Sequence, residues 1–267
     1  MNPRLARISL FPIKSLDAFE PERATITPVG PIAGDRRYAM VDAEGEYVNG
    51  KRTAAVHRLR ASYDDPDRVE FSTPESDADE FDLTTDREEL AEHLSEQFGY
   101  PVELIRDDTG MPDDTEIPGP TVISTATIEE VASWFGLAPE NVRRRFRANL
   151  EIEGVPAFWE DRLFSDQGRV VDFSIGGVRL AGVNPCQRCV VPSRDPDTGE
   201  EFEGFRERFI EKRGKTLPEW TDSDRFDHQF RLMVNTRVPE DGAGEIEVGD
   251  AVEIVGEREE TGRNRVA

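Results

Sequence analysis

The chain has 267 residues and, with 33 Lys or Arg against 56 Asp or Glu, a formal net charge of −23. An acidic balance of this size repels the phosphates of nucleic acids and of anionic membranes, which argues against broad binding to either. Length alone predicts about two domains, and a hydrophobic fraction of 36% is sufficient to form their cores.

Lysine is scarce, because only Lys14, Lys51, Lys212 and Lys215 occur and every other basic residue is Arg. A surface rich in Asp and Glu and poor in Lys fits a protein from a salt-loving organism, since roughly molar salt shortens the Debye length to about 3 Å. The alternative is an ordinary acidic protein encoded by a GC-rich genome. We favour the halophilic interpretation.

This interpretation makes a prediction about salt. We expect the melting temperature to rise as KCl increases from low to molar concentration, because counterions screen the mutual repulsion of the excess carboxylates. A KCl series followed by thermal unfolding measures the effect. A melting temperature that stays flat or falls across the series would contradict the halophilic interpretation.

The sequence predicts neither a membrane span nor an exported protein. No run of about 18 apolar residues occurs, and the first ten residues lack the apolar region of a signal peptide. Two cysteines are too few for a disulfide framework. We therefore expect a cytoplasmic protein.

The first eighty or so residues predict short strands about ten residues apart, separated by Gly and Pro. This spacing favours a barrel or a sandwich. The strand-like segments cover residues 4–11, 24–29, 37–41, 47–48, 69–71 and 81–83.

Helices are predicted in the middle of the chain. Capping-box patterns begin at Thr85 and at Thr127, and the apolar periodicity that follows each pattern stops at a glycine, Gly99 or Gly136. A proline at a first helical position suggests one more helix. The predicted helices cover 86–98, 127–135 and a short segment that begins at Pro139.

The remainder predicts further strands. These cover 145–152, 170–183 with a Gly176-Gly177 turn, and 246–255 with a turn at Gly249-Asp250. Residues 107–120 have the composition of a loop or linker, and residues 257–267 are polar and expected to be frayed.

Both cysteines lie in one short motif, Cys186-Gln-Arg188-Cys189. Half a zinc site is one interpretation, but the chain has no other cysteine and only three widely spaced histidines. A thioredoxin-type redox pair needs a βαβ context, and the flanking segments read as strands and turns. Two alternatives remain: a thiolate that binds or attacks a ligand, which Arg188 would favour at Cys189, and two small buried side chains in a strand.

The context of this motif resembles the MOSC family, named after the C-terminal domain of molybdenum cofactor sulfurase. The resemblance rests on Pro-Cys-x-Arg-Cys with a downstream Asp-Pro-Asp-Thr-Gly, on the upstream Arg145-Phe-Arg-Ala-Asn-Leu, and on the closing strand pair at 245–255. Segments 9–16, 34–38, 42–47 and 50–52 resemble the N-terminal β-barrel domain that accompanies it. Together these motifs span roughly residues 4–256, in the family's order.

The resemblance implies a mainly β (α+β) fold, with two β-barrel-like domains and a few short helices. The implied organisation is an N-terminal β-barrel domain over 1–100, a MOSC domain over 101–257 and a polar tail over 258–267. Proteins of similar architecture include the mitochondrial amidoxime-reducing component and its bacterial homologues.

In those proteins a molybdenum–pterin cofactor (molybdopterin) lies between the two domains. The resemblance implies that Cys189 ligates the metal and is the catalytic residue, whereas Cys186 is not a ligand. It implies cofactor contacts from a set of polar, small and aromatic residues: Lys14, Ser15, Arg36, Ser124, Thr125, Ala126, Arg147, Asn149, Gln187, Arg188 and Phe230.

The implied function is an oxidoreductase that reduces N-hydroxylated or N-oxide-type small molecules. Two cysteines exclude a four-cysteine iron–sulfur cluster within this chain, so we expect a separate electron-donor protein of ferredoxin or flavoprotein type. No pyridoxal-phosphate domain of the kind in cofactor sulfurases is recognisable. One alternative is a sulfur-carrier or cofactor-handling module with a persulfide on Cys189, and another is a binding protein without turnover.

Some positions depart from the family pattern or have ordinary explanations. Ala148 stands in place of a usual Pro, and the segment around Phe230 differs from the familiar pattern, which leaves that residue's placement open. The stretch Asp195 to Gly199 is interpreted as a turn. Three histidines are predicted to be surface or packing residues: His57, His93 and His228.

Overall fold

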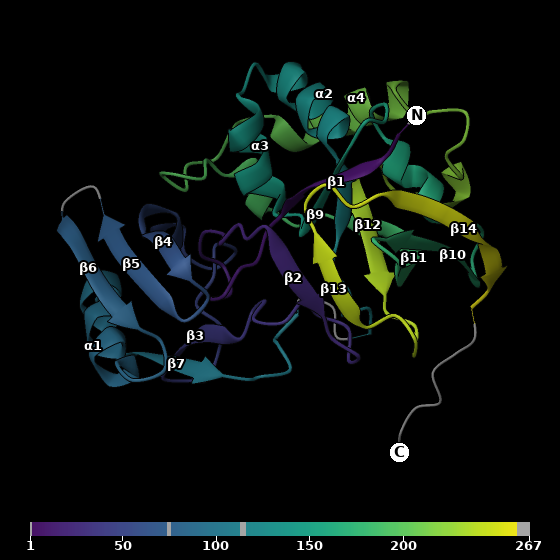
Figure 1. Ribbon diagram of the computed structural model, residues 1–267. Coiled ribbons are helices and arrows are strands. Elements are labelled where there is room, and N and C mark those ends of the chain that lie inside the picture. The colour runs from purple at the N-terminus through teal and green to yellow at the C-terminus, as the bar shows by residue number, and fades with distance from the viewer. Residues whose placement is uncertain (1, 74–75, 113–115, 261–267) are drawn as a thin grey trace.

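The computed structural model describes residues 2–73, 76–112 and 116–260 and has two lobes (Figure 1). One lobe contains helix α1 (Arg87–Phe98) and two small sheets. The other contains a large sheet with helices packed against it. The expected mainly β fold class is therefore confirmed. No helix in these described ranges is long and apolar enough to cross a membrane.

The larger lobe is built on a sheet that, within the described residues, has seven strands. Neighbouring strands are antiparallel except for the parallel pair β8 and β9. In spatial order the strands are β1 (Arg4–Ile8), β9 (Leu150–Glu153), β8 (Val122–Ser124), β12 (Arg231–Arg237), β11 (Val178–Gln187), β10 (Arg169–Ile175) and β14 (Val252–Glu259).

Hydrogen bonds bring the start of β1 next to the start of β14, so the two outer strands of the sheet approach each other at one end. The N–H of Leu5 donates to the carbonyl of Asp250 at 2.9 Å, and the N–H of Val252 donates to the carbonyl of Pro3 at 3.0 Å. The strands β2 (Arg23–Ile26) and β13 (Gly244–Glu247) pair beside it, and Ile26 and Ile246 join its apolar core. The larger lobe therefore combines both ends of the chain.

The smaller lobe has a core of its own. In it β3 (Tyr38–Asp42) pairs with β7 (Val102–Arg106), and three further strands form a meander: β4 (Arg60–Asp65), β5 (Arg68–Thr73) and β6 (Ser76–Asp82). Leu90 and Leu94 of α1 lie four residues apart on one helix face and are fully buried in this core. Helix α1 ends at Gly99, whose φ is +75°, as predicted.

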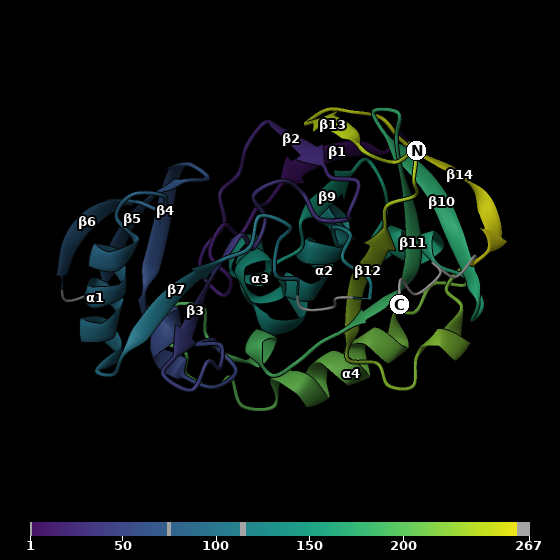
Figure 2. The same cartoon turned by 90° about the horizontal axis from the view of Figure 1, so that it is seen from below.

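Three helices cover one side of the larger lobe: α2 (Thr125–Phe135), α3 (Pro139–Phe146) and α4 (Phe205–Lys215) (Figures 1 and 2). Aromatic rings fill the space between them. Trp134 of α2 meets Phe209 of α4 edge-on with ring centroids 5.4 Å apart, and Phe135 stacks on Phe205 at 4.1 Å. Four short 3₁₀ helices complete the described structure: η1 (Ala54–Arg58), η2 (Trp159–Leu163), η3 (Val191–Ser193) and η4 (Ser223–Arg225).

The structure corrects two predictions in the middle of the chain. Helix α2 begins two residues earlier than the capping box suggested, because Ser124 is the cap and its hydroxyl accepts the N–H of Thr127 at 3.2 Å. Residues 145–149 are not strand, since α3 continues to Phe146 and β9 begins only at Leu150.

Two more differences concern polar segments. Helix α4 was not predicted, because its only buried apolar side chains are Phe205 and Phe209, and their partners come from other parts of the chain. Residues 257–259, predicted to be frayed, continue strand β14 and pair with β10. Arg258 there also donates to Asp172 at 2.8 Å, so polar contacts stabilise a strand that lacks apolar alternation.

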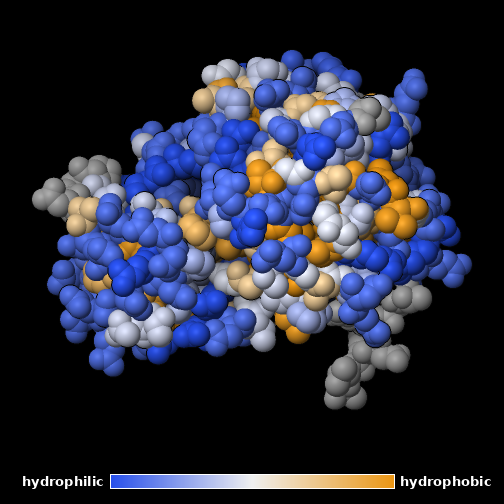
Figure 3. Space-filling model, in the orientation of Figure 1, coloured by the Kyte–Doolittle hydropathy of each residue, from blue (hydrophilic) through white to orange (hydrophobic). Residues whose placement is uncertain are grey.

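On the face shown in Figure 3, hydrophilic residues predominate and apolar residues gather mainly over the larger lobe. The polar covering agrees with the low hydrophobic fraction of the chain.

Candidate functional site

A cavity of about 510 Å³ lies between the two lobes. Its volume falls within the range of about 300–1,000 Å³ that is usual for small-molecule sites. Its walls come from distant parts of the sequence, chiefly the segments 7–20, 31–36, 49–59, 117–123, 140–151 and 186–191.

The cavity is positively charged although the protein is strongly acidic. Of the described residues that line it, five are Asp or Glu and nine are basic: Arg7, Lys14, Arg36, Lys51, Arg143, Arg144, Arg145, Arg147 and Arg188. The lining thus carries an excess of four positive charges, whereas the whole chain carries −23. Such an arrangement attracts an anionic ligand and focuses it between the lobes.

Unusual backbone conformations are concentrated at the same place. Within the described ranges, five non-glycine residues have a positive φ, and four of them line the cavity. Left-handed backbone is unfavourable for residues with a side chain, and such strain accumulates at functional sites. The four are Ser15 at +78°, Arg36 at +50°, Arg147 at +57° and Met233 at +64°.

The ring of Phe11 lies close to two guanidinium groups. The Cζ atom of Arg147 is 4.0 Å from the ring centroid, and that of Arg36 is 5.1 Å away. Arg36 also pairs with Asp35, whose other carboxylate oxygen accepts the N–H of Phe11 at 2.8 Å. Arg147, at the end of α3, donates to the carbonyl of Leu16 at 2.6 Å. These contacts orient both cations and connect the two lobes.

Lys14 is directed into the protein, since only 9% of its surface is exposed. Its Nζ atom donates to the carbonyl of Met111 at 3.0 Å and lies 4.8 Å from the ring centroid of Tyr47. Its neighbour Ser15 lines the cavity as well. The sequence motif that contains Lys14 and the one that contains Cys189 therefore meet at one cavity.

The guanidinium of Arg188 contacts the other cysteine of the motif. Its Nη1 atom lies 3.0 Å from the sulfur of Cys186, and its Nη2 atom donates to the carbonyl of Phe146 at 3.0 Å. Residues 186 and 188 are two positions apart at the end of an extended strand, so their side chains share a face. The guanidinium thus contacts Cys186 rather than its sequence neighbour Cys189. Gln187 and both cysteines line the cavity.

Other residues implied by the family resemblance have structural roles here. Asn149 lines the cavity, but its amide joins two segments: Nδ2 donates to the carbonyl of Ser9 at 3.0 Å, and Oδ1 accepts the N–H of Thr121 at 3.2 Å. Among the described residues that form the lining, four of the implied ones do not occur: Ser124, Thr125, Ala126 and Phe230. Ser124 ends β8 and caps α2, Thr125 and Ala126 begin α2, and Phe230 is buried among the aromatic rings.

Several lining residues were missed, Lys51 and His57 among them. Lys51 follows a turn in which the side chain of Asn49 accepts its N–H at 3.0 Å. His57 stands on η1, and its Nε2 atom is shielded from solvent without a hydrogen-bond partner in the described part of the chain. Burial, together with the cations of Arg194 and Arg147, lowers the pKa of His57 despite a contact with the Gly50 backbone. No local sequence signal distinguishes His57 from a packing histidine.

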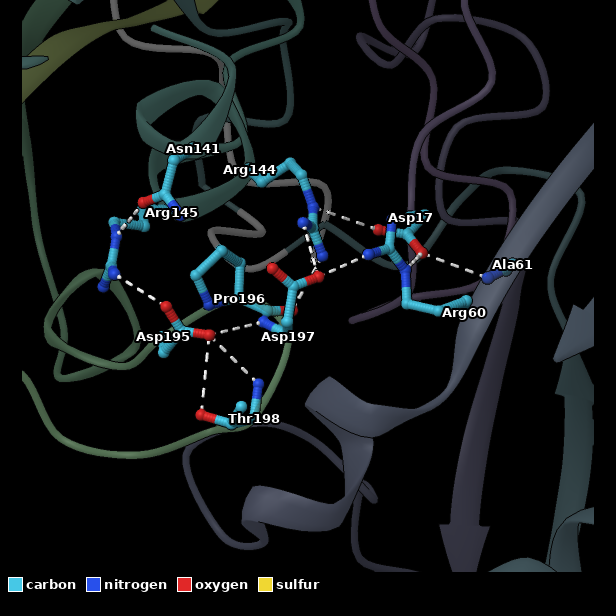
Figure 4. A network of polar contacts seen from close by, with 10 residues as sticks. All are labelled: Asp17, Arg60, Ala61, Asn141, Arg144, Arg145, Asp195, Pro196, Asp197 and Thr198. Carbon is cyan, nitrogen blue, oxygen red and sulfur yellow. Dashed lines mark hydrogen bonds and ion pairs between the residues drawn. The ribbon is translucent and has the colours of Figure 1, made fainter. Parts of the chain in front are cut away.

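An alternating set of four charged residues joins the lobes beside the cavity (Figure 4). Asp197 accepts hydrogen bonds from Arg60 at 2.6 Å and from Arg144 at 2.8 Å. Asp17 accepts one from Arg60 at 2.8 Å and lies 3.7 Å from Arg144. The turn at 195–199 thereby connects the larger lobe to β4 of the smaller lobe.

Two family models match the chain. The model of the MOSC N-terminal beta barrel domain covers residues 2–136, and the model of the MOSC domain covers residues 121–253. The human protein named molybdenum cofactor sulfurase is 23% identical over 260 residues. That match includes 78% of this chain but only 28% of the human protein, so the chain spans less than a third of that relative's length.

Among solved structures, the YUAD protein from Bacillus subtilis aligns with 95% of this chain and 96% of its own, at 13% identity and a TM-score of 0.40. That TM-score is too low to establish a common fold.

Proposed function

Because the chain belongs to the MOSC family, we propose that it binds a molybdenum–pterin cofactor in the cavity between its lobes and uses it to reduce N-hydroxylated small molecules. One observation carries the proposal most directly: a thiol and an excess of positive charge line one cavity of a protein whose net charge is −23.

The residues present suit such a cofactor. A pterin that ends in a phosphate needs cations and hydrogen-bond donors, which Lys14, Arg36 and Arg147 supply. The Nε atom of Arg188 is buried and has no hydrogen-bond partner among the described residues, so a polar ligand could satisfy it.

The proposal must also account for the ligands of the metal. Within residues 2–73, 76–112 and 116–260, no group of three or more His, Cys, Asp or Glu is placed to hold a metal ion. A metal at Cys189 would therefore need its other ligands from the cofactor itself. A thiolate is a soft ligand of the kind that complements the sulfur ligands of a pterin dithiolene.

In this proposal the protein binds the cofactor and orients it between the lobes. When bound, the molybdenum supplies the two-electron chemistry that removes oxygen from an N–O bond. Cys189 holds the metal, and the strained backbone at Ser15, Arg36 and Arg147 holds donors in place before the ligand arrives. Both lobes contribute walls to the site.

We propose that electrons reach the site from a separate protein. An iron–sulfur cluster commonly takes four cysteines, and this chain has two. We propose a ferredoxin- or flavoprotein-type donor.

A second candidate function is a sulfur carrier with a persulfide on Cys189. The similarity to a protein named molybdenum cofactor sulfurase favours it, as does a cavity lined by two free thiols. In this case the cavity would accept a sulfur donor or a cofactor precursor and would not retain a metal.

Analysis of the purified protein separates the two functions. Protein from a host that makes the cofactor should contain molybdenum and pterin, and it should reduce hydroxylaminopurine or an amidoxime with a chemical electron donor. Protein without metal but with a persulfide would favour the carrier. Protein that contains the cofactor but does not reduce N–O substrates would support the proposed cofactor binding and overturn the proposed reaction.

Lys14→Ala should weaken cofactor binding about 10- to 150-fold. Loss of a hydrogen bond to a charged group costs about 1.5–3 kcal/mol, and about 1.4 kcal/mol corresponds to a factor of ten. Molybdenum per chain after dialysis measures the effect. Lys215→Ala is the control, because Lys215 lies at the end of α4, pairs with Glu211 and does not occur among the described lining residues. Equal metal retention in both variants would contradict a role for Lys14.

A further inference from the structure

One histidine in the cavity has a place that packing alone does not explain. His57 lies on η1, where Val56 is buried beneath it and the hydroxyl of Thr53 accepts the N–H of Ala55 at 3.3 Å. Its ring lines the cavity, and its buried Nε2 atom lies beside the Gly50 backbone without meeting a side-chain partner in the described structure. A buried polar atom left in this way is unfavourable, and such atoms often mark functional positions.

The placement of the ring depends on two glycines. A Cβ atom at Gly50 would lie 2.6 Å from the Nε2 atom of His57, so the ring occupies space that a side chain at residue 50 would take. A Cβ atom at Gly199 would lie 2.7 Å from the carbonyl oxygen of Ala54, so the turn at 195–199 packs directly on η1. Both lobes therefore hold the helix that carries His57.

Reduction of an N–O bond needs protons as well as electrons. An N-hydroxylated amine takes up two electrons and two protons; the N–O bond breaks, one N–H and one O–H bond form, and the products are the amine and water. The separate donor protein supplies the electrons, and a group in the cavity must supply a proton to the departing oxygen.

The carboxyl groups of the cavity are poorly suited to give that proton. All five of those among the described lining residues lie within 4.0 Å of an arginine nitrogen, so each is already engaged in an ion pair. The pairs are Asp17 with Arg60, Glu20 with Arg7, Asp35 with Arg36, Glu140 with Arg143, and Glu151 with Arg143. An imidazole, in contrast, gains and loses a proton near neutral pH.

We propose, on the basis of the proposed function, that His57 is the catalytic acid that protonates the oxygen leaving the substrate nitrogen. The neutral imidazole that remains takes its next proton from water at the mouth of the cavity. The geometry that carries this assignment is the shared cavity wall of His57 and Cys189, which come from different lobes.

The charges around His57 set its protonation. Burial disfavours the imidazolium most, and the cations of Arg194, after η3, and Arg147, at the end of α3, disfavour it as well. Asp195, at the start of the turn that packs on η1, and the backbone of Gly50 favour it. The pKa of His57 is lowered by the balance of these influences, and removal of the Asp195 charge should lower it further.

The first test compares His57→Gln with His93→Gln, a matched change in the core of the smaller lobe, where His93 packs on Phe81 at 5.3 Å. Both variants are purified with cofactor and assayed with dithionite-reduced methyl viologen and benzamidoxime. We expect His57→Gln to lower kcat about 100-fold, the lower end for loss of a general acid. Molybdenum per chain and KM should not change. The wild-type kcat should fall as the pH rises and His57 loses its proton, and this fall should be absent from His57→Gln.

Gly50→Ala provides a second variant that keeps the imidazole but displaces it. Because the added Cβ would lie 2.6 Å from Nε2, the ring must move, and kcat should fall while metal content stays unchanged. This variant separates the position of His57 from any loss of stability caused by its removal.

A second test needs no cofactor. The chain has three histidines, so proton NMR of the apo-protein can follow each imidazole through a pH titration, with assignments from the two glutamine variants. His57 should titrate below the ordinary histidine range, and Asp195→Asn should shift its midpoint to still lower pH. If His57 titrates as an exposed histidine and its midpoint is the same in Asp195→Asn, the proposed role of His57 is overturned.

The activity results separate this inference from the function on which it rests. Active wild-type protein with an equally active His57→Gln variant overturns the role of His57 and leaves the proposed function intact. Loss of molybdenum from that variant also overturns the role, because His57 would then hold the cofactor. Wild-type protein that contains cofactor but reduces no N–O substrate overturns both proposals.

Discussion

Cys189→Ala is expected to abolish molybdenum retention and N–O reduction, whereas Cys186→Ala should leave most of both. The reason is that, in the proposed function, Cys189 would be the one thiolate that the protein gives to the metal, and a metal site that loses its only protein ligand loses most of its affinity. Molybdenum per chain, measured by mass spectrometry after gel filtration, gives the result directly.

Cys186→Ala is the matched control, because the two cysteines lie three residues apart and line the same cavity. The sulfur of Cys186 receives a hydrogen bond from Arg188 at 3.0 Å, so its loss should loosen that guanidinium and reduce occupancy only in part. Two variants that behave alike, or in the reverse order, would show that the assignment within the motif is wrong.

Asp161→Ala is expected to destabilise the folded protein by about 3–5 kcal/mol, the usual effect of breaking a buried ion pair. Asp161 and Arg213 lie 2.5 Å apart, with side chains only 4% and 1% exposed. The Nε and Nη1 atoms of Arg213 already lack hydrogen-bond partners in the described structure. Without Asp161, the buried cation keeps only its contacts with the rings of Phe158 and Phe226. Urea denaturation followed by circular dichroism measures the change.

The double variant Asp161→Ala/Arg213→Met tests the cause of this destabilisation. Replacement of both charges removes the desolvation penalty, so the double variant should be more stable than Asp161→Ala alone. If the double variant is as unstable as the single one, the loss arises from packing rather than from an uncompensated charge. A single-variant effect below about 1 kcal/mol would place the pair among ordinary surface ion pairs.

Part of the candidate site was predictable from sequence motifs. The resemblance brought together Lys14, Arg36, Arg147 and Cys189, and all four line the cavity. Their contribution to cofactor binding remains a prediction that the variants above test. The same resemblance included Phe230 and the start of α2, which lie outside the described lining, because family motifs do not separate residues that face a cavity from residues that support it.

His57 and the partner of Arg188 could not be found in the same way. The role proposed for His57 depends on Gly50, on Asp195 and on the packing of a turn more than 130 positions away, none of which leaves a pattern in the residues around it. Arg188 contacts Cys186 because the strand end directs alternate side chains to one face. Adjacency in sequence alone therefore did not predict the contact with Cys186.

Local features of the sequence determined where several helices and turns occur, but not how the strands and helices pack together. Glycines at 99 and 136 end their helices because only a residue without a side chain adopts left-handed backbone at little cost. The strand–turn–strand at the C-terminal side was likewise visible as apolar runs around Gly249-Asp250. Only the tertiary structure decided that β13 pairs with β2 and that the start of β14 lies beside the start of β1. It also decided that the charged helix α4 packs against aromatic side chains. The physical reason is that turns and helix ends depend on neighbouring residues, whereas strand pairing and a cavity between lobes depend on the burial of surfaces that are distant in the chain.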